Sequence, residues 1–190
     1  MEKIKTIRIF SQEWMAEDLN VRHYSNGDPI LNANNDQKRI LFENQKKGFY
    51  SYYNDNELNG QNSGSLYNWY AVNDPRGIAP EGFRVTNFLD WNRLIDNLGG
   101  EDEARMWFKS NSDLFGLHFR GYGNQEEEND NYEFYSLNSS SFYFLSSWDG
   151  KENQEIDWKI GSDGRNGNRF VYSKVGNRIG LLLSIRCIKI

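Results

Sequence analysis

Residues 64–85 constrain the fold of this chain more than any other segment. This short stretch carries four aromatic residues, two prolines and three glycines. Proline fixes the backbone angle φ, glycine allows positive φ, and aromatic side chains must be buried or used in binding. The stretch predicts a strand from Leu66 to Val72, then an ordered turn, then a second strand that starts near Phe83–Val85.

Two helices are expected after this stretch. Residues 87–97 predict the longer one, because Thr86 or Asn87 can cap its start and Gly99 follows its apolar stripe. Residues 102–109 predict the second helix. A short helical turn is expected at Trp14–Leu19.

The other segments predict strands and loops. Asn, Asp and Gly are frequent in residues 25–38 and 54–63, which therefore predict loops, and the acidic residues 125–131 predict a solvated loop. Strands are expected at residues 4–10, 49–53, 115–122, 142–145, 155–160, 170–172 and 180–188, with a hairpin turn at 162–168.

Composition limits the classes of function. A chain of 190 residues is the size of one domain, and we expect a single domain over residues 1–190. The net charge of −5 and the scattered Lys and Arg residues argue against nucleic-acid binding. Aromatic residues make up 15% of the chain, so a few large side chains can build its core.

The sequence also limits location and covalent cross-linking. No segment is apolar for long enough to cross a membrane, and the first ten residues lack the apolar core of a secretory signal. We expect a cytoplasmic protein as the sequence is written, or a surface or secreted one if a leader was removed or a leaderless route is used. Cys187 is the sole cysteine, so no intrachain disulfide can form, and we expect it to be buried.

Six ordered blocks of this sequence, from Trp14–Val21 to Leu183–Lys189, resemble one bacterial family, the Fibrobacter succinogenes major paralogous domain. Trp14–Val21 resembles the family opening "WMAENLNV", and Gly64–Ala71 is similar to "GRLYNWYA". Ala79–Val85 resembles "xPxGWHV", and residues 91–100 resemble "EWxxLxxxLGG". An aromatic run from Phe142 to Trp148 and a closing segment similar to "SVRCVKD" complete the resemblance over nearly the whole chain.

The resemblance implies a fold. The family belongs to the C-type-lectin-like superfamily, so we expect an α+β domain with two helices, a small twisted antiparallel sheet and long irregular loops. Family members often carry a cysteine before the Pro-x-Gly motif, where this chain has Ala79. The family brings no assigned catalytic residues with it.

The sequence contains little evidence for a catalytic site or a metal site. His23 and His118 are the only histidines, and neither has the spacing of a metal ligand set. No Gly-x-Ser-x-Gly turn is present, and one cysteine cannot supply the pair that formylglycine-generating enzymes of this superfamily use. The calcium-binding tripeptides of sugar-binding C-type lectins are not intact around Pro80 or Trp148. We expect no enzyme activity, no cofactor and no calcium-dependent sugar site.

Ligand binding is the remaining function. In this superfamily the long loop region and the last strands present ligands, and Tyr or Trp beside Asp, Asn and Arg is a mix that binds sugars or proteins. The candidate ligand-binding residues are Tyr122, Tyr143, Trp148, Asp149, Trp158, Asp163, Arg165 and Asn168.

Three functions stay open at this point. We expect a non-enzymatic binding module for a glycan or protein ligand. A variable recognition protein with diversified loops, or a structural surface or assembly subunit, are the alternatives, and the oligomeric state is open.

Overall fold

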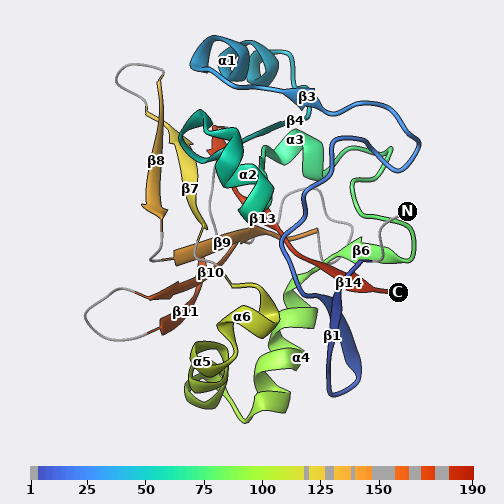
Figure 1. The fold of residues 1–190 in the computed structure, drawn as a ribbon, viewed down its shortest axis with the longest axis vertical. Coiled ribbons are helices and arrows are strands. Elements are labelled where there is room, and N and C mark those ends of the chain that lie inside the picture. Colours follow the sequence, from blue (N-terminus) through green and yellow to red (C-terminus); the bar gives the residue numbers. More distant parts are fainter. Residues whose placement is uncertain are drawn as a thin grey trace.

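A computed structural model describes residues 4–117, 120–126, 131–137, 140–146, 157–162, 168–173 and 180–190 of the protein. Over these residues the fold is mixed, with several small sheets, none of them closed, and helices around them (Figure 1). The helices are α1 (Asp36–Asn44), the 3₁₀ helix η1 (Tyr53–Asp55), α2 (Glu57–Ser63), α3 (Trp69–Val72), α4 (Phe88–Leu98), α5 (Glu101–Ser110) and α6 (Ser112–Phe115).

The strands of the described residues form three sheets. The first contains β1 (Thr6–Ile9), β2 (Gln12–Met15), β14 (Cys187–Lys189) and β6 (Phe83–Val85), in that order. The second contains β11 (Asn168–Ser173), β10 (Asp157–Ser162), β9 (Ser140–Phe144), β7 (Arg120–Gln125) and β12 (Leu181–Leu182), with β8 (Tyr132–Leu137) on β7 and β13 (Ser184–Ile185) on β9. The third contains β3 (Leu31–Asn32), β4 (Phe49–Ser51) and β5 (Leu66–Tyr67).

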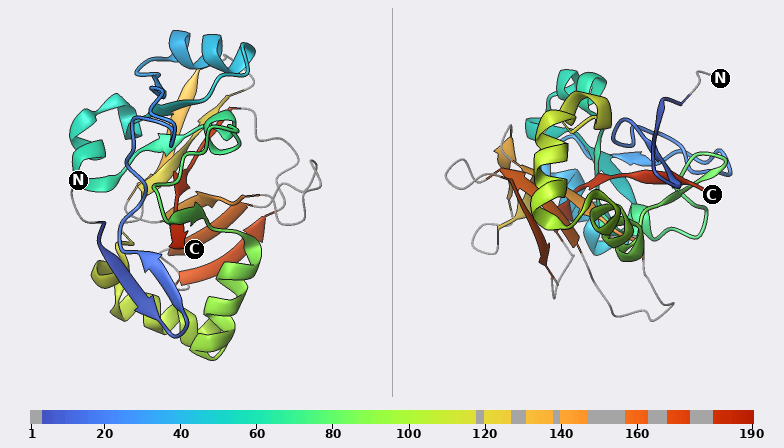
Figure 2. Two further views of the ribbon diagram at one scale, coloured as in Figure 1. Left: turned by 90° about the vertical axis from the view of Figure 1, so that its right-hand side faces the viewer. Right: turned by 90° about the horizontal axis from the view of Figure 1, so that it is seen from below.

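The first sheet brings the two ends of the chain together. The β1–β2 hairpin pairs with β14, with Trp14 opposite Ile188, and β14 pairs with β6 on its other side. Figures 1 and 2 show β1 and β14 on the same side of the molecule. The helical turn expected at Trp14–Leu19 is wrong, because Trp14 and Met15 continue β2 and Trp14 is fully buried among core residues of α4 and β14.

The two expected helices are confirmed as α4 and α5. The Asn87 side chain accepts a hydrogen bond from the backbone of Asp90, and the Asp90 carboxylate accepts one from the backbone of Asn87. This reciprocal cap fixes the start of α4, and Gly99 ends it in a left-handed conformation. Trp91, Leu94 and Ile95 form the buried face of α4.

Several predictions for the first half of the chain are wrong because polar residues form helices there. Residues 54–63, expected as a loop, contain η1 and α2, and Asn56 caps α2. The loop expected at 25–38 ends inside α1, which Asn35 caps. The strand expected at Leu66–Val72 stops at Tyr67, because Asn68 caps α3.

The predictions for the second half are closer. The strands expected at 142–145, 155–160 and 170–172 overlap β9, β10 and β11, and β10 and β11 pair antiparallel with Ser162 opposite Asn168. Residues 163–167, the centre of the expected turn, lie outside the described residues. The strand expected at 115–122 is wrong at its start, where Phe115 ends α6, and the strand expected at 180–188 is divided into β12, β13 and β14.

The structure therefore confirms a mixed α and β fold and corrects its detail. The expected single antiparallel sheet is replaced by three sheets, in which β3–β4, β7–β9 and β9–β13 pair in parallel. Four further α-helices, α1, α2, α3 and α6, join the two that were expected. None of the helices in the described ranges is long and apolar enough to cross a membrane.

A buried arginine joins distant parts of the chain. Arg186 is fully buried just before β14 and forms an ion pair with buried Asp18, at 2.5 Å between Nη2 and Oδ1. The same guanidinium donates to the backbone carbonyls of Met15, Phe115 and Gly116. Because a buried charge needs hydrogen bonds on all sides, this one side chain fixes the C-terminal segment against β2 and the end of α6.

Gly116 makes this junction possible. Its φ is +63°, and a Cβ atom there would lie 2.0 Å from the carbonyl oxygen of Ala16. No side chain fits that gap, so the position requires glycine. The close approach of the two backbones puts the Gly116 carbonyl within reach of Arg186.

Cys187 is buried, as expected, and belongs to the core cluster around Tyr67 and Ile185. Burial raises the pKa of its thiol to about 12. The thiol therefore stays protonated at neutral pH and packs as a small apolar side chain.

Replacing the central arginine tests its structural role. Arg186→Met removes the cation and leaves the Asp18 carboxylate buried without its partner, so we expect a loss of about 3–5 kcal/mol in the free energy of unfolding. Urea denaturation measures this loss. The control is Lys189→Met, which removes the exposed ion pair with Glu13 and costs less than about 1 kcal/mol. Equal losses in both variants would contradict the role assigned to Arg186.

Candidate binding site

The β7–β8 hairpin has two faces of different chemistry. In an antiparallel pair, alternate residues point to opposite sides of the strands. Gly121, Gly123, Tyr132 and Phe134 lie on the side that faces the protein body. The opposite side carries polar and aromatic residues that are half-buried or exposed. The hairpin therefore has a packed inner face and an accessible outer face.

The inner face holds the hairpin on the body of the protein. Phe134 packs on Tyr53 of η1, with 5.2 Å between ring centroids. A Cβ atom on Gly123 would lie 3.1 Å from atoms of both Leu182 and Phe134. The glycine thus lets the side chains of Leu182 and Phe134 lie close against the backbone of β7.

The outer face is named the tyrosine face here and is formed by five residues that are half-buried or exposed. Tyr122 lies directly opposite Tyr135, and Asn124 lies opposite Glu133. The two tyrosine rings pack at 5.4 Å between centroids and 31° between planes. The tyrosine face consists of Tyr122, Asn124, Glu126, Glu133 and Tyr135.

Hydrogen bonds order the polar groups of the tyrosine face. The hydroxyl of Tyr135 lies 2.6 Å from Oε1 of Glu126 and 2.9 Å from Oε2 of Glu133, and it can donate to either. Asn124 donates to the same Oε1 of Glu126 at 3.3 Å. These side chains therefore hold fixed positions around the aromatic pair.

The carboxylates shift the titration of both tyrosines. Hydrogen bonding to Glu126 and then to Glu133 raises the pKa of Tyr135 above its usual value, because ionisation would place a third negative charge there. Burial and the charge of Glu126 raise the pKa of Tyr122. Both phenols stay neutral at physiological pH and offer hydroxyl donors and ring surfaces.

Of the candidate residues predicted from the sequence, the structure places Tyr122 on this face and Tyr143 in the core. Tyr143 is fully buried, packs against Trp91 at 5.5 Å between ring centroids, and its hydroxyl accepts a hydrogen bond from Arg186. It cannot share a ligand with Tyr122.

The other candidates are described only in part or not at all. Trp158 lies in β10 opposite Tyr143, and Asn168 begins β11 opposite Ser162. Trp148, Asp149, Asp163 and Arg165 lie outside the described residues.

Sequence reasoning missed four members of the tyrosine face. The strand β8 was not expected, and residues 125–131 were expected as a loop, although Gln125 still belongs to β7. The alternation of glycine with larger residues from Arg120 to Asn124 was the available signal, because it marks a strand with one closely packed face.

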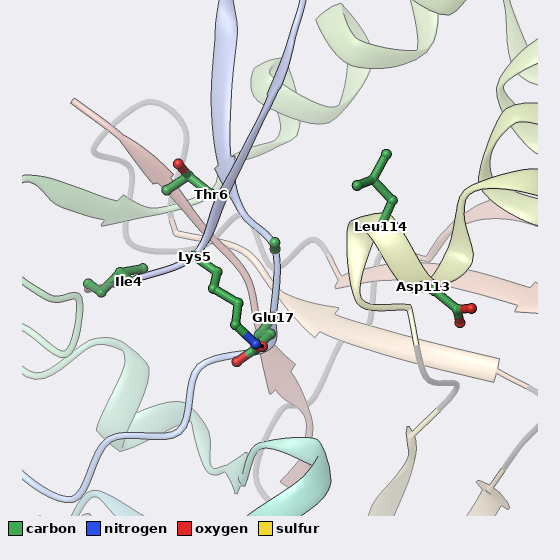
Figure 3. A pocket seen from close by; sticks show the side chains of 7 residues that line it. Ile4, Lys5, Thr6, Glu17, Asp113 and Leu114 are labelled. Atoms are coloured by element: carbon green, nitrogen blue, oxygen red, sulfur yellow. Dashed lines mark hydrogen bonds and ion pairs between the residues drawn. The ribbon is translucent and has the colours of Figure 1, made fainter. Parts of the chain in front are cut away.

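A surface hollow offers a second place for a ligand (Figure 3). It has a volume of about 520 Å³ and lies between β1 and α6. Lys5 and Glu17 pair with each other at 2.8 Å on one side, while Asp113 and Leu114 of α6 lie across from them. The polar groups that line the hollow include a satisfied ion pair and no nucleophile beside a base, so it has less to offer a ligand than the tyrosine face.

Metal ligands are not gathered in the part of the chain that the structure describes. No group of three or more His, Cys, Asp or Glu residues is placed there to hold a metal ion. His23 is exposed and pairs through its backbone with Pro29, and His118 lies outside the described ranges.

The two faces of the hairpin predict different costs of truncation. Phe134→Ala removes a packed inner side chain, and we expect a loss of roughly 2 kcal/mol in the free energy of unfolding. Tyr135→Ala on the outer face removes one cross-strand ring contact and costs about 1 kcal/mol or less. Thermal or urea denaturation measures both. A larger loss for Tyr135→Ala would reverse the assignment of the faces.

Comparison with known proteins identifies the family. The sequence profile of the Fibrobacter succinogenes major domain matches residues 7–189. No curated protein and no solved structure matches the chain. The match spans all three sheets and includes both β7 and β8. This chain therefore belongs to the Fibrobacter succinogenes major domain family.

Proposed function

We propose that this protein is a non-catalytic binding module that takes a glycan on the tyrosine face without calcium. The observation that carries the proposal is the aromatic pair Tyr122 and Tyr135, ordered by Glu126, Glu133 and Asn124. Sugar rings have apolar C–H surfaces that pack on aromatic rings, and hydroxyl groups that bond to carboxylates and amides. The tyrosine face has both kinds of group side by side.

The fixed side-chain positions on the tyrosine face support a role in ligand binding rather than in packing alone. The carboxylates and the Asn124 amide are held by hydrogen bonds before a ligand arrives, so less conformational entropy is lost on binding. The inner face of the same hairpin carries the packing, through Phe134 and Gly123. The outer face is thus left for another molecule.

The scaffold in this proposal is a C-type-lectin-like domain. The proposal draws on the resemblance of the sequence blocks and on the pairing of the first and last strands in one sheet. The two longer helices, α4 and α5, and the strands of the second half fit the same architecture. On such a scaffold the tyrosine face belongs to the half of the chain that presents ligands.

The proposal also states that the tyrosine face catalyses no reaction. Glu126 and Glu133 lie within hydrogen-bond distance of the same Tyr135 hydroxyl, which can donate to either one, and the tyrosine face holds no serine, cysteine or histidine that they could activate. The role of these carboxylates is then to orient hydroxyl groups of the ligand.

A glycan array probed with the purified protein tests the proposal. We expect binding to one class of glycan, unchanged when EDTA replaces millimolar calcium. Tyr122→Ala and Tyr135→Ala should each weaken that binding by about tenfold or more, because each removes about 1.4 kcal/mol of stacking and hydrogen bonding. The matched control is Phe10→Ala, which removes an exposed aromatic ring at the tip of the β1–β2 hairpin and should leave binding unchanged.

Three outcomes would contradict this function. A blank array would exclude a glycan of the classes displayed and leave a protein ligand, which pull-down from the native host would then identify. Binding that needs calcium would contradict the calcium-free site. Binding that survives both tyrosine substitutions would place the glycan elsewhere on the protein.

A further inference from the structure

Three buried polar atoms without partners lie beneath the β7–β8 hairpin. Within the described part of the chain, Arg39 Nε, Glu43 Oε2 and the Tyr132 hydroxyl have no hydrogen-bond partner, although all three residues are at least nine-tenths buried. The Arg39 guanidinium lies 5.3 Å from the centre of the Tyr132 ring, and Glu43 follows Arg39 by one turn of α1. Buried polar groups are rarely left unpaired, so this cluster calls for an explanation.

Glu43 is the member of this cluster that can change its charge near neutral pH. Its Oε1 accepts a hydrogen bond from Asn68 Nδ2 at 3.2 Å. Burial raises the pKa of Glu43 to about 7, while the hydrogen bonds from Asn68 and from the Gly180 backbone oppose this rise. At pH 7 the neutral and ionised forms are therefore both populated.

No cation among the described residues forms an ion pair with Glu43. Arg39 is the nearest basic side chain on the same helix, but its guanidinium pairs with Asp36 and Asp55 instead. The phenols of Tyr132 on β8 and Tyr70 on α3 face Glu43 closely enough for its charge to raise the pKa of each, after the larger effect of burial. An ionised Glu43 is thus a buried negative charge without a counter-charge.

Both strands of the hairpin are tied to this cluster. Tyr132 is the first residue of β8, and its backbone N–H donates to Asp36 of α1 at 3.2 Å. Gly180, whose backbone lies close enough to Glu43 to lower the pKa of that carboxyl group, immediately precedes β12, in which Leu181 pairs with Asn124 of β7. In Figure 1 the upper ends of β7 and β8 lie to the left of α1 and slightly lower than it.

We propose that Glu43 is a proton-operated switch that controls how firmly the β7–β8 hairpin packs on α1. The neutral carboxyl group has an O–H that can be donated to the unpaired Tyr132 hydroxyl, and this bond would hold β8 against α1. Loss of the proton to solvent leaves an unpaired charge under β8 and loosens the hairpin. The switch acts on the support of the tyrosine face, whatever ligand that face takes.

The direction of the pH effect follows from the titration. The pKa of Glu43 in the folded protein lies above its unfolded value of 4.5. Its stabilising contribution is therefore complete below about pH 4.5 and is lost as the pH rises through about 7. The hairpin should be seated in mild acid and loosened in mild alkali.

Hydrogen exchange of the backbone amides tests the switch without any ligand. Protection of residues 132–135 is compared at pH 5.5 and pH 8.5, after correction for the intrinsic exchange rate. In the unmodified protein we expect protection to fall at least tenfold at pH 8.5, while the amides of α4 keep theirs. Glu43→Gln, which stays neutral, should protect the hairpin equally at both pH values. The exposed Glu81→Gln is the matched control and should behave as the unmodified protein does.

Two results would overturn the proposal. One is hairpin protection that does not depend on pH in the unmodified protein, and the other is Glu43→Gln with the same pH dependence as the unmodified protein. If Glu43→Gln fails to fold, the ¹³C signal of the Glu43 carboxyl group in the unmodified protein decides, because a midpoint below pH 5 refutes the switch. Glycan binding does not enter these measurements, so their failure leaves the proposed function standing.

Discussion

The buried ion pair between Arg186 and Asp18 is the interaction on which the rest of this structure depends. It joins a segment just before the last strand to residues near the second strand, and the same guanidinium holds the turn after α6. Neither charge could remain buried alone, so the first sheet, the helical end of the molecule and the C-terminal segment must form together. The fold is cooperative because these distant segments share one guanidinium.

Within the described residues, the tyrosine face makes no hydrogen bond to the Arg186–Asp18 ion pair. This separation between the buried ion pair and the surface suits a binding site. Its hairpin rests on Tyr53 and Leu182 and is tied to α1 through Asp36. Arg186 bonds instead to Tyr143 in the core, on the neighbouring strand β9. A binding surface can therefore vary in sequence or seating without loss of the core. Its polar groups are fixed locally, by contacts within β7 and β8.

Local signals predicted the helices α4 and α5 but not α1, α2, α3 or α6, and pairing between distant segments decided where the strands lie. The start and end of α4 follow from Asn87 and Gly99, which act within one turn of the helix. Trp14 lies in a strand because its partner is Ile188, far along the chain, and nothing near Trp14 signals that pairing. Tyr122 and Tyr143 both lie in strands of the second sheet, yet register places one on an open face and the other beside Arg186.

The meeting of the first and last strands in one sheet has a practical consequence for orientation. In Figure 1, β1 and β14 lie on the side of the molecule away from β8. A surface, a tag or a neighbouring domain joined next to β14 would attach on the side away from β8, so the β7–β8 hairpin would point away from the attachment. Immobilisation through the C-terminal end would therefore display the hairpin to solution, whereas coupling through random surface lysines would mask it on part of the molecules.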